Sequence, residues 1–196
     1  MSNRIINTPI TPENNKVLHD TLKHYFGYDS FRAGQAEIID QIMHGRDSLV
    51  LMPTGGGKSL CYQLPATILP GITIVVSPLI ALMKDQVDSL MRQGIPAAFI
   101  NSSLDGATIN GIFTQLSQGE LKLLYVAPER LTNQYFLQRL SHLSISLFAI
   151  DEAHCISQWG HDFRPAYTQL QCLKEHFPYI PVMALTATAD VTTRKD

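Results

Sequence analysis

The sequence predicts a three-layered, open α/β domain with a mostly parallel central sheet. Short runs of apolar, often β-branched residues alternate along the chain with stretches in which apolar residues recur at helical spacing. These runs are apolar almost throughout, which is typical of strands buried on both faces of a parallel sheet. The predicted strands are a run that begins after Gly45 and the segments 72–76, 97–100, 121–126, 146–150 and 182–186.

Helices are predicted between these strands, and no internal repeat or interdomain linker interrupts the pattern. The first helix begins at Glu13 and ends near Gly27, and the second presents Ile38, Ile39 and Ile42 on one side. Later helices are predicted over residues 79–92, 108–117, 133–140 and 167–176. Residues 1–12, which contain prolines, are predicted to be irregular, and residues 13–196 are predicted to form a single domain.

The composition is that of a globular protein, since 45% of the 196 residues are hydrophobic and 16% are charged. No apolar run approaches the length of a membrane span, and the N-terminal residues lack the basic start and apolar core of a signal peptide. Cys61, Cys155 and Cys172 are scattered, which predicts reduced thiols in a cytoplasmic protein and no zinc site. The net charge of −2 provides no basic footprint for nucleic acid, which counts against such a partner until the motifs are considered.

A glycine-rich stretch follows the first predicted strand: residues 52–59 are Met-Pro-Thr-Gly-Gly-Gly-Lys-Ser. A strand that stops at such a turn and restarts as a helix directs free backbone N–H groups at one spot, which suits a phosphate. Lys58 would reach the β- and γ-phosphates of a nucleotide, and the Ser59 hydroxyl would hold Mg²⁺. The usual phosphate-loop pattern begins with a glycine, which Met52 replaces here. The alternative is a flexible loop that contains Lys-Ser by chance, and the apolar strand before it argues against that.

A second motif, Asp151-Glu152-Ala153-His154, follows the apolar run 147–150. Ligands bind at the carboxyl ends of strands in open α/β sheets, so these acids occupy a position where a ligand would lie. We expect Asp151 to hold Mg²⁺ through its water shell and Glu152 to position and activate the attacking water. Adjacent acids at a strand end are common by chance, but a phosphate loop on an earlier strand of the same sheet strengthens the assignment. His154 is either a coupling residue or a cap of the turn.

The two motifs together resemble those of a superfamily 2 helicase, in which the first glycine of the loop is often missing. Residues 151–165, Asp-Glu-Ala-His-Cys-Ile-Ser-Gln-Trp-Gly-His-Asp-Phe-Arg-Pro, closely resemble the RecQ family of ATP-dependent DNA helicases. The segments 77–86, 127–130 and 184–189 are also similar to that family, in the same order. The resemblance runs from about Tyr25 to the C-terminus and covers the first of the family's two RecA-like motor domains. It implies a RecA-like fold of the P-loop NTPase class.

The resemblance implies that the segment 28–35 recognises adenine. Tyr28 would stack on the base and Gln35 would bind its N6 and N7, whereas without the family Tyr28 and Phe31 would be interpreted as core aromatics. The implied nucleotide-binding residues are Tyr28, Arg32, Gln35, Thr54, Gly55, Gly56, Gly57, Lys58 and Ser59. The implied catalytic residues are Lys58, Asp151 and Glu152, and the implied metal ligands are Ser59 and Asp151.

The resemblance also implies a loop at 155–167 that senses single-stranded DNA. Trp159, Phe163 and Tyr167 offer rings on which unpaired bases stack. The alternative is a packed surface loop in which Trp159 is half-buried. Other residues would line the strand through hydroxyls and a few cations, which is compatible with the net charge of −2. The implied DNA-binding or coupling residues are Ser77, Lys84, Gln86, Arg130, His154, Gln158, Trp159, His161, Phe163, Arg164, Thr186 and Thr188.

The sequence therefore predicts the N-terminal motor domain of a RecQ-type, ATP- and Mg²⁺-dependent 3′–5′ DNA helicase that acts in DNA repair and recombination. Its expected partners are single-stranded and duplex DNA and the second motor domain of the same protein, with no membrane partner. The family's zinc-binding and winged-helix regions would lie beyond residue 196, so no zinc is expected in this chain. The expected location is the cytoplasm, in association with the nucleoid. Because the second domain supplies the arginine finger, the chain alone is expected to be nearly inactive.

Three alternatives remain open at this point. A DEAH-type RNA helicase domain is the nearest relative with similar motifs. A small-molecule phosphotransferase would use the same phosphate loop, but it predicts a substrate lid and gives no reason for Trp159 and its neighbours. A non-catalytic DNA-binding or regulatory module predicts that Lys58 and Glu152 are dispensable.

Overall fold

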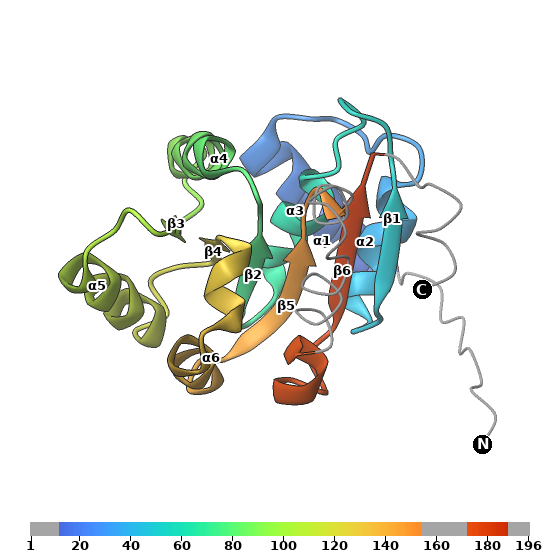
Figure 1. Cartoon of the computed structure of the whole chain (residues 1–196). Coiled ribbons are helices and arrows are strands. Elements are labelled where there is room, and N and C mark those ends of the chain that lie inside the picture. Colours follow the sequence, from blue (N-terminus) through green and yellow to red (C-terminus); the bar gives the residue numbers. More distant parts are fainter. Residues whose placement is uncertain (1–11, 154–171, 188–196) are drawn as a thin grey trace, which may run out of the picture.

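The computed structural model describes residues 12–153 and 172–187 and contains a six-stranded sheet in which every pair of neighbouring strands is parallel (Figure 1). The order of the strands is β1-β6-β5-β2-β4-β3. The strands are β1 (Ser48–Leu51), β2 (Ile72–Val76), β3 (Ala97–Ile100), β4 (Leu123–Val126), β5 (Ile145–Ile150) and β6 (Val182–Thr186). The predicted α/β class and parallel sheet are thereby confirmed.

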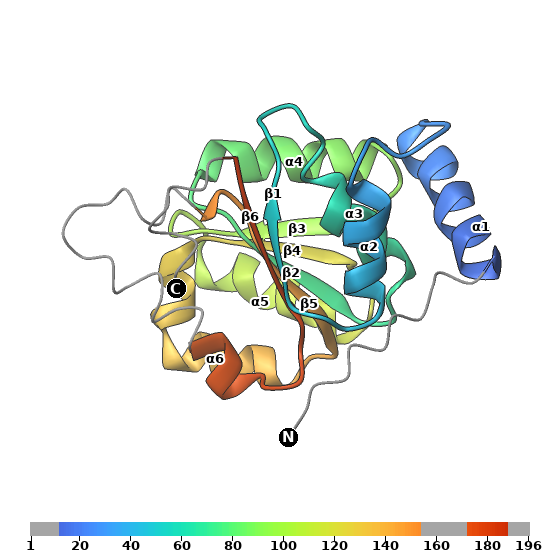
Figure 2. The same cartoon turned by 90° about the vertical axis from the view of Figure 1, so that its right-hand side faces the viewer.

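Helices cover both faces of this sheet. One face packs against α2 (Gln35–Met43), α3 (Leu60–Ile68) and α4 (Ile80–Arg92), and the other packs against α5 (Gly106–Ser117) and α6 (Gln134–Ser141). Figure 2 shows α4 on one side of the strands and α5 and α6 on the other. The three-layered architecture follows from this arrangement.

The alternation of side chains along the strands explains why the runs are apolar throughout. In β2, Ile74 and Val76 belong to the core under α5 and α6, whereas Val75 belongs to the core under α2, α3 and α4. Successive side chains point to opposite faces of a strand, so a sheet covered on both sides requires apolar residues at every position.

A smaller cluster attaches the N-terminal helix to the domain. Helix α1 (Pro12–Thr21) continues into a short π-helix, η1 (Leu22–Phe26), which ends at Gly27 with φ of 72°. Leu18 and Leu22 are buried against residues of α2 and of α3. The predicted helix of residues 13–27 is therefore present, with a π-helical last turn.

Several element bounds differ from the prediction by one or two residues; α5, for example, begins at Gly106 and not at residue 108. Strand β4 begins at Leu123, two residues later than expected, because Leu121 is buried in the core without joining the strand ladder. A 3₁₀-helix, η2 (Pro128–Thr132), follows β4 where no element was predicted. Of the helix predicted over 167–176, only the part from residue 172 onward is described. Among the described helices, none is long and apolar enough to cross a bilayer.

The topology brings distant segments together at the carboxyl edge of the sheet. After β1 the chain enters the glycine-rich loop and then α3, which leads to β2. In the sheet, β6 and β5 lie between β1 and β2. On this path α3 contacts both β2 and β5. The residues that follow β5 therefore lie beside the first turn of α3.

Candidate functional site

The glycine-rich loop between β1 and α3 has the backbone of a phosphate cradle. Gly55 and Gly57 have φ of 77° and 85°, a conformation that side-chain-bearing residues rarely adopt. A Cβ atom on Gly57 would lie 2.5 Å from Nε2 of Gln35, so a side chain there would displace the Gln35 amide. The loop leads directly into the N-terminus of α3, whose dipole favours an anion. The N–H groups of residues 60–62 donate to carbonyls of the preceding turn, so the N–H groups of the loop before them are the ones that face an anion.

Lys58 and Ser59 stand at the end of this loop. Lys58 is only 8% exposed, and its Nζ lies 3.4 Å from the carbonyl oxygen of Met52. The side chain of Met52 is buried in the core near Cys61, with the two sulfur atoms 3.9 Å apart. The missing first glycine is thereby explained: at this position the side chain points into the core and the carbonyl faces the lysine.

The segment predicted to recognise a base lies against the same loop. Gln35 is 1% exposed; its Oε1 accepts a hydrogen bond from the backbone N–H of Arg32, and its Nε2 donates to the carbonyl of Gly57 at 3.1 Å. The guanidinium of Arg32 donates to the carbonyl of Gly55. Tyr28 is 54% exposed and lines the edge of the pocket described below, so its ring is available for stacking.

The two acids lie at the carboxyl end of β5, as predicted. Asp151 is 5% exposed, and burial together with the adjacent Glu152 raises the pKa of its carboxyl group. Glu152 has φ of 50° and is the one non-glycine residue with positive φ in the described part of the chain. Such strain is concentrated at functional sites, and here it turns Glu152 toward the pocket that Asp151 also lines.

A chain of buried polar side chains connects these acids to α3 and α4. The Tyr62 hydroxyl donates to Oδ2 of Asp151 at 3.3 Å, and Nε2 of Gln63 donates to the Tyr125 hydroxyl at 3.1 Å and to Oε1 of Gln86 at 2.8 Å. Burial, Tyr125 and Asp151 raise the pKa of Tyr62 well above its usual range. Tyr62 therefore stays protonated and acts as a hydrogen-bond donor at any physiological pH.

These segments enclose a pocket of about 460 Å³, a size typical of small-molecule sites. It is lined by Phe26, Tyr28, Ser30, Arg32, Gln35, Thr54, Gly55, Gly57, Lys58, Ser59, Leu60, Gln63, Leu82, Gln86, Gln93, Asp151 and Glu152. The pocket brings together the predicted base, phosphate and metal residues from three separate stretches of the sequence.

The residues present fit Mg²⁺. Ser59 and Asp151 line one pocket, and a hydroxyl with a carboxylate is the small oxygen-donor set that Mg²⁺ uses when it keeps several waters. Among residues 12–153 and 172–187, no group of three or more His, Cys, Asp or Glu side chains could hold a metal ion, so a site built wholly from protein ligands is not seen there.

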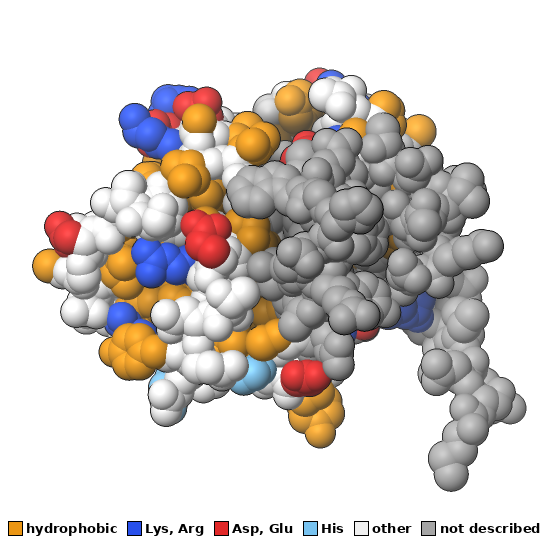
Figure 3. All heavy atoms as spheres, viewed as in Figure 1, with side chains coloured by type: hydrophobic (Ala, Val, Ile, Leu, Met, Phe, Trp, Pro, Cys, Tyr) orange, Lys and Arg blue, Asp and Glu red, His pale blue; other side chains and the backbone are white. Residues whose placement is uncertain are grey.

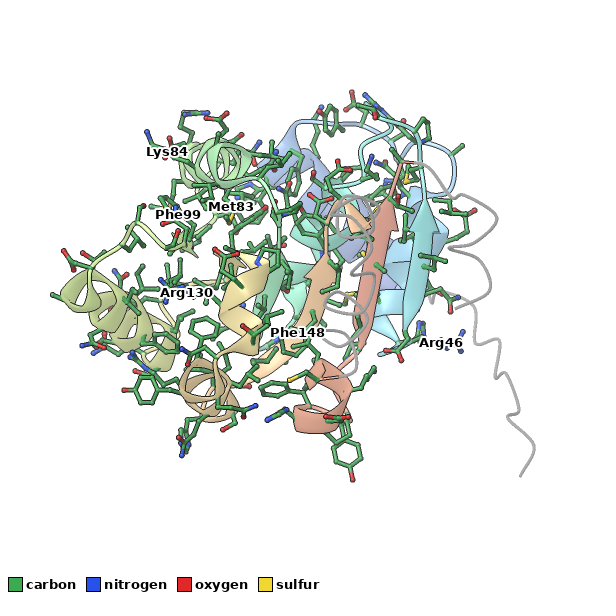
Figure 4. The ribbon with its side chains drawn as sticks, in the orientation of Figure 1. Arg46, Met83, Lys84, Phe99, Arg130 and Phe148 are labelled. Carbon is green, nitrogen blue, oxygen red and sulfur yellow. The ribbon has the colours of Figure 1, made fainter. Side chains whose placement is uncertain are left out.

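The residues predicted to face DNA are found in varied surroundings. Lys84 is exposed on the outer side of α4, whereas Met83 points toward the sheet (Figure 4). Arg130 donates to the carbonyl of Asn101. Ser77 is 1% exposed, and its hydroxyl has no hydrogen-bond partner among the described residues.

Two further residues of that set lie close to the phosphate loop. Gln86 lines the pocket, and the backbone carbonyl of the buried Thr186 accepts a hydrogen bond from the N–H of Met52 at 3.2 Å. Both residues therefore lie near the pocket and the phosphate loop. Their roles in DNA binding remain predictions. His154, Gln158, Trp159, His161, Phe163, Arg164 and Thr188 lie outside the described residues.

Charge is dispersed on the face of the domain seen in Figure 1. On the described part of that face, basic side chains lie apart from one another and several are next to acidic ones (Figure 3). This distribution agrees with the net charge of −2, and the described part of this face carries no broad basic surface.

Sequence reasoning missed Tyr62 and Gln63. Both lie in the first turn of α3, which begins directly after Ser59. This position was a usable signal, because a helix that starts at a phosphate loop carries its first turn into the site. Their partners could not be inferred, because Asp151 lies 89 positions and Tyr125 62 positions away in the sequence.

The chain matches the model of the DEAD/DEAH box helicase family over residues 32–196. It is 58% identical over 177 residues to the ATP-dependent DNA helicase RecQ of Pasteurella multocida, covering 90% of this chain and 28% of that protein. It is 52% identical to RecQ of Bacillus subtilis, and the match covers 89% of this chain and 30% of that protein. It is 45% identical to the RecQ-like DNA helicase BLM of Xenopus laevis, and this match covers 98% of this chain and 14% of that protein. The chain thus spans less than a third of the length of these relatives.

Solved helicase structures share the fold. The helicase Lhr of Mycobacterium smegmatis, bound to single-stranded DNA and AMP-PNP, superposes with a TM-score of 0.67 at 19% identity, over 89% of this chain and 25% of that one. A hypothetical ATP-dependent RNA helicase of Sulfolobus tokodaii gives a TM-score of 0.66 at 19% identity, over 92% and 53%. At this identity the likeness confirms the predicted RecA-like fold and no more.

Proposed function

The chain belongs to the DEAD/DEAH box helicase family, and on that premise we propose that it is the first motor domain of a RecQ-type, ATP-dependent DNA helicase. The observation that carries the proposal is the pocket in which the phosphate loop, the buried Lys58 and the strained Glu152 meet. The similarity to RecQ helicases of several organisms supports DNA as the substrate.

Several polar groups of the pocket have a part in ATP hydrolysis. Lys58 neutralises charge on the transferring phosphoryl group, and the N–H groups of the glycine-rich loop before α3 hold the phosphates. Ser59 and Asp151 would hold Mg²⁺, which neutralises charge on the β- and γ-phosphate oxygens when bound. Glu152 orients the attacking water and takes its proton.

The base would lie at the other end of the pocket. Tyr28, which is 54% exposed, stacks on the adenine ring, and the amide of Gln35 reads its edge. Gln35 also donates a hydrogen bond to the carbonyl of Gly57, and Arg32 donates one to the carbonyl of Gly55. Binding of the base is therefore transmitted to the phosphate loop through these two hydrogen bonds.

The whole-protein activity belongs to the same proposal. In this proposal a second motor domain supplies the arginine finger and closes on the nucleotide. The partners are single-stranded and duplex DNA, and translocation runs 3′ to 5′. The protein acts in DNA repair and recombination at the nucleoid. Zinc has no place in this part of the protein. The exposed Lys84 and the loop 155–167 would contact the strand.

The test uses the 196-residue chain. It should bind ATP with Mg²⁺ and bind single-stranded DNA more tightly than RNA of the same sequence, measured by fluorescence anisotropy. It should neither hydrolyse ATP efficiently nor separate a duplex, because an arginine finger contributes about 10³–10⁵ in rate. Robust DNA-dependent ATP turnover by this chain alone would contradict the two-domain mechanism. Tighter binding of RNA than of DNA would favour an RNA helicase. Transfer of phosphate to an added acceptor would favour a phosphotransferase.

A further inference from the structure

Both oxygens of the Asp151 carboxylate are held by the protein. Oδ1 accepts the backbone N–H of Glu152 at 2.9 Å, and Oδ2 accepts the phenol O–H of Tyr62 at 3.3 Å. An ionised carboxylate has about four lone-pair sites, so each oxygen keeps room for a further contact from the pocket side. The two hydrogen bonds together fix the plane in which the carboxylate lies.

Tyr62 makes its bond from a position outside the pocket. It is fully buried, with 0% of its surface exposed, and it is not among the residues that line the pocket, whereas Asp151 is. Its ring packs in the core between the sheet and its helices. The hydroxyl therefore supports the carboxylate from behind and leaves its front face to a ligand.

Tyr62 also ties the carboxylate to the other metal residue. Ser59 and Tyr62 are three positions apart at the start of α3, and residues at this spacing lie on the same side of a helix. One helical turn thus carries the hydroxyl of Ser59, which lines the pocket, and the hydroxyl that orients Asp151.

We infer that Tyr62 is a positioning residue for the metal, which sets the Asp151 carboxylate relative to Ser59 without itself touching metal or nucleotide. The inference rests on the proposed function. Mg²⁺ demands near-ideal octahedral geometry, so a carboxylate free to rotate binds it less well. Groups that hold a metal ligand from behind typically contribute about 10- to 100-fold in metal affinity.

Tyr125 provides a matched comparison. It is 1% exposed, and its ring lies 6.5 Å from that of Tyr62 at an interplanar angle of 66°. Its hydroxyl accepts a hydrogen bond from Gln63 at 3.1 Å and forms none with Asp151. The Tyr125 hydroxyl also interacts with that of Tyr62, so Tyr62→Phe and Tyr125→Phe each delete one buried hydroxyl of the same cluster, but only the first removes a direct hydrogen bond to Asp151.

The experiment titrates Mg²⁺ against the 196-residue chain in the presence of a fluorescent ATP analogue and records the concentration that gives half of the metal-dependent signal. Binding of the analogue is measured separately in EDTA, and thermal unfolding is followed for every variant. Tyr62→Phe should raise the half-saturating Mg²⁺ concentration by about tenfold or more. It should leave the affinity in EDTA within about twofold. Tyr125→Phe reaches Asp151 only through Tyr62, so it should raise the half-saturating Mg²⁺ concentration by no more than about twofold and leave the affinity in EDTA unchanged, although both variants lose thermal stability.

Two outcomes would overturn the inference. The first is a half-saturating Mg²⁺ concentration for Tyr62→Phe that stays within twofold of wild type. The second is an equal increase of that concentration in Tyr125→Phe, which would indicate a general loss of packing. Asp151→Asn is the reference, because it removes the carboxylate itself and should raise the half-saturating Mg²⁺ concentration at least as much as Tyr62→Phe does. If the wild-type chain binds no ATP analogue at all, the proposed function fails. If it binds with normal Mg²⁺ dependence and Tyr62→Phe is unchanged, only the role of Tyr62 is refuted.

Discussion

The side-chain amide of Gln63 donates a hydrogen bond to Oε1 of Gln86 across 2.8 Å and so joins the first turn of α3 to the middle of α4. The same Nε2 donates to the Tyr125 hydroxyl on β4 at 3.1 Å. Helix α3 begins at the phosphate loop, and α4 begins just after Ser77 at the end of β2. One buried amide therefore connects the phosphate end of the pocket to the helix that carries Lys84 on its outer side.

We predict that Gln86→Ala weakens the communication between nucleotide and DNA. Gln63 keeps its bond to Tyr125, so the free energy of unfolding should fall by no more than about 1.5 kcal/mol, the net contribution of one hydrogen bond. The affinity for single-stranded DNA, measured with and without an ATP analogue, should depend less on the nucleotide than in wild type. Gln138→Ala, on the exposed face of α6, is the control and should behave as wild type. An unchanged nucleotide effect in Gln86→Ala would show that this hydrogen bond carries no signal.

Glu152→Gln should separate binding from chemistry. The amide keeps the shape of the side chain but takes no proton, so hydrolysis should fall by about 10²–10⁴-fold while nucleotide affinity stays within about threefold. Hydrolysis is measured in a protein that joins this chain to a second motor domain, and binding is measured on the chain. Glu120→Gln, which changes an exposed acid in the loop after α5, is the matched control. Retained hydrolysis in Glu152→Gln would assign the water-activating role to another group.

A pair of glycine substitutions tests the packing. A Cβ on Gly71 would lie 2.4 Å from the carbonyl oxygen of Ser144, so Gly71→Ala should lower the free energy of unfolding by about 1–3 kcal/mol. Gly111 lies inside α5, and a Cβ added there would meet no atom of another element within 4 Å, so Gly111→Ala should raise stability by about 0.5–1 kcal/mol. For a chain of this size each kcal/mol corresponds to roughly 2–4 °C in the unfolding temperature. Thermal shifts of the same sign in both variants would contradict the packing described for β2 and α5.

The thiol of Cys61 should resist alkylation. Burial raises its pKa to about 12, so at pH 8 only about one thiol in 10⁴ is ionised, and the thiolate fraction grows tenfold for each pH unit up to that value. Cys172 is only partly buried, and we expect it to react with iodoacetamide faster than Cys61 in the native protein. Peptide mass spectrometry after native and urea-denatured labelling reads both sites. Equal rates in the native state would mean that the core around Met52 and α3 opens readily.

Strands could be predicted well from the sequence, because a strand covered on both faces is apolar at every position. The bounds of β2, β3 and β6 are those expected from their apolar runs. The end of β5 was also correctly placed, since the acids mark it.

The contacts within the site could not be predicted in the same way. Gln86 lies beside the buried stripe of α4 formed by Met83, Val87 and Leu90, and helical spacing alone does not tell toward which neighbour such a boundary residue turns. Its partner Gln63 comes from another helix, 23 positions earlier. Similarly, the sequence around Met52 does not show that its carbonyl faces Lys58. The direction of this carbonyl depends on the packing of the Met52 side chain in the core.

The central claim is that Lys58 and its loop bind the phosphates of ATP. Isothermal titration calorimetry of ATP with Mg²⁺ into the 196-residue chain, wild type and Lys58→Ala, tests it most directly. A charged hydrogen bond contributes about 1.5–3 kcal/mol, so Lys58→Ala should weaken ATP binding by about 10- to 100-fold while its thermal unfolding stays cooperative. Failure of the wild-type chain to bind ATP, or an affinity unaffected by Lys58→Ala, would contradict the account.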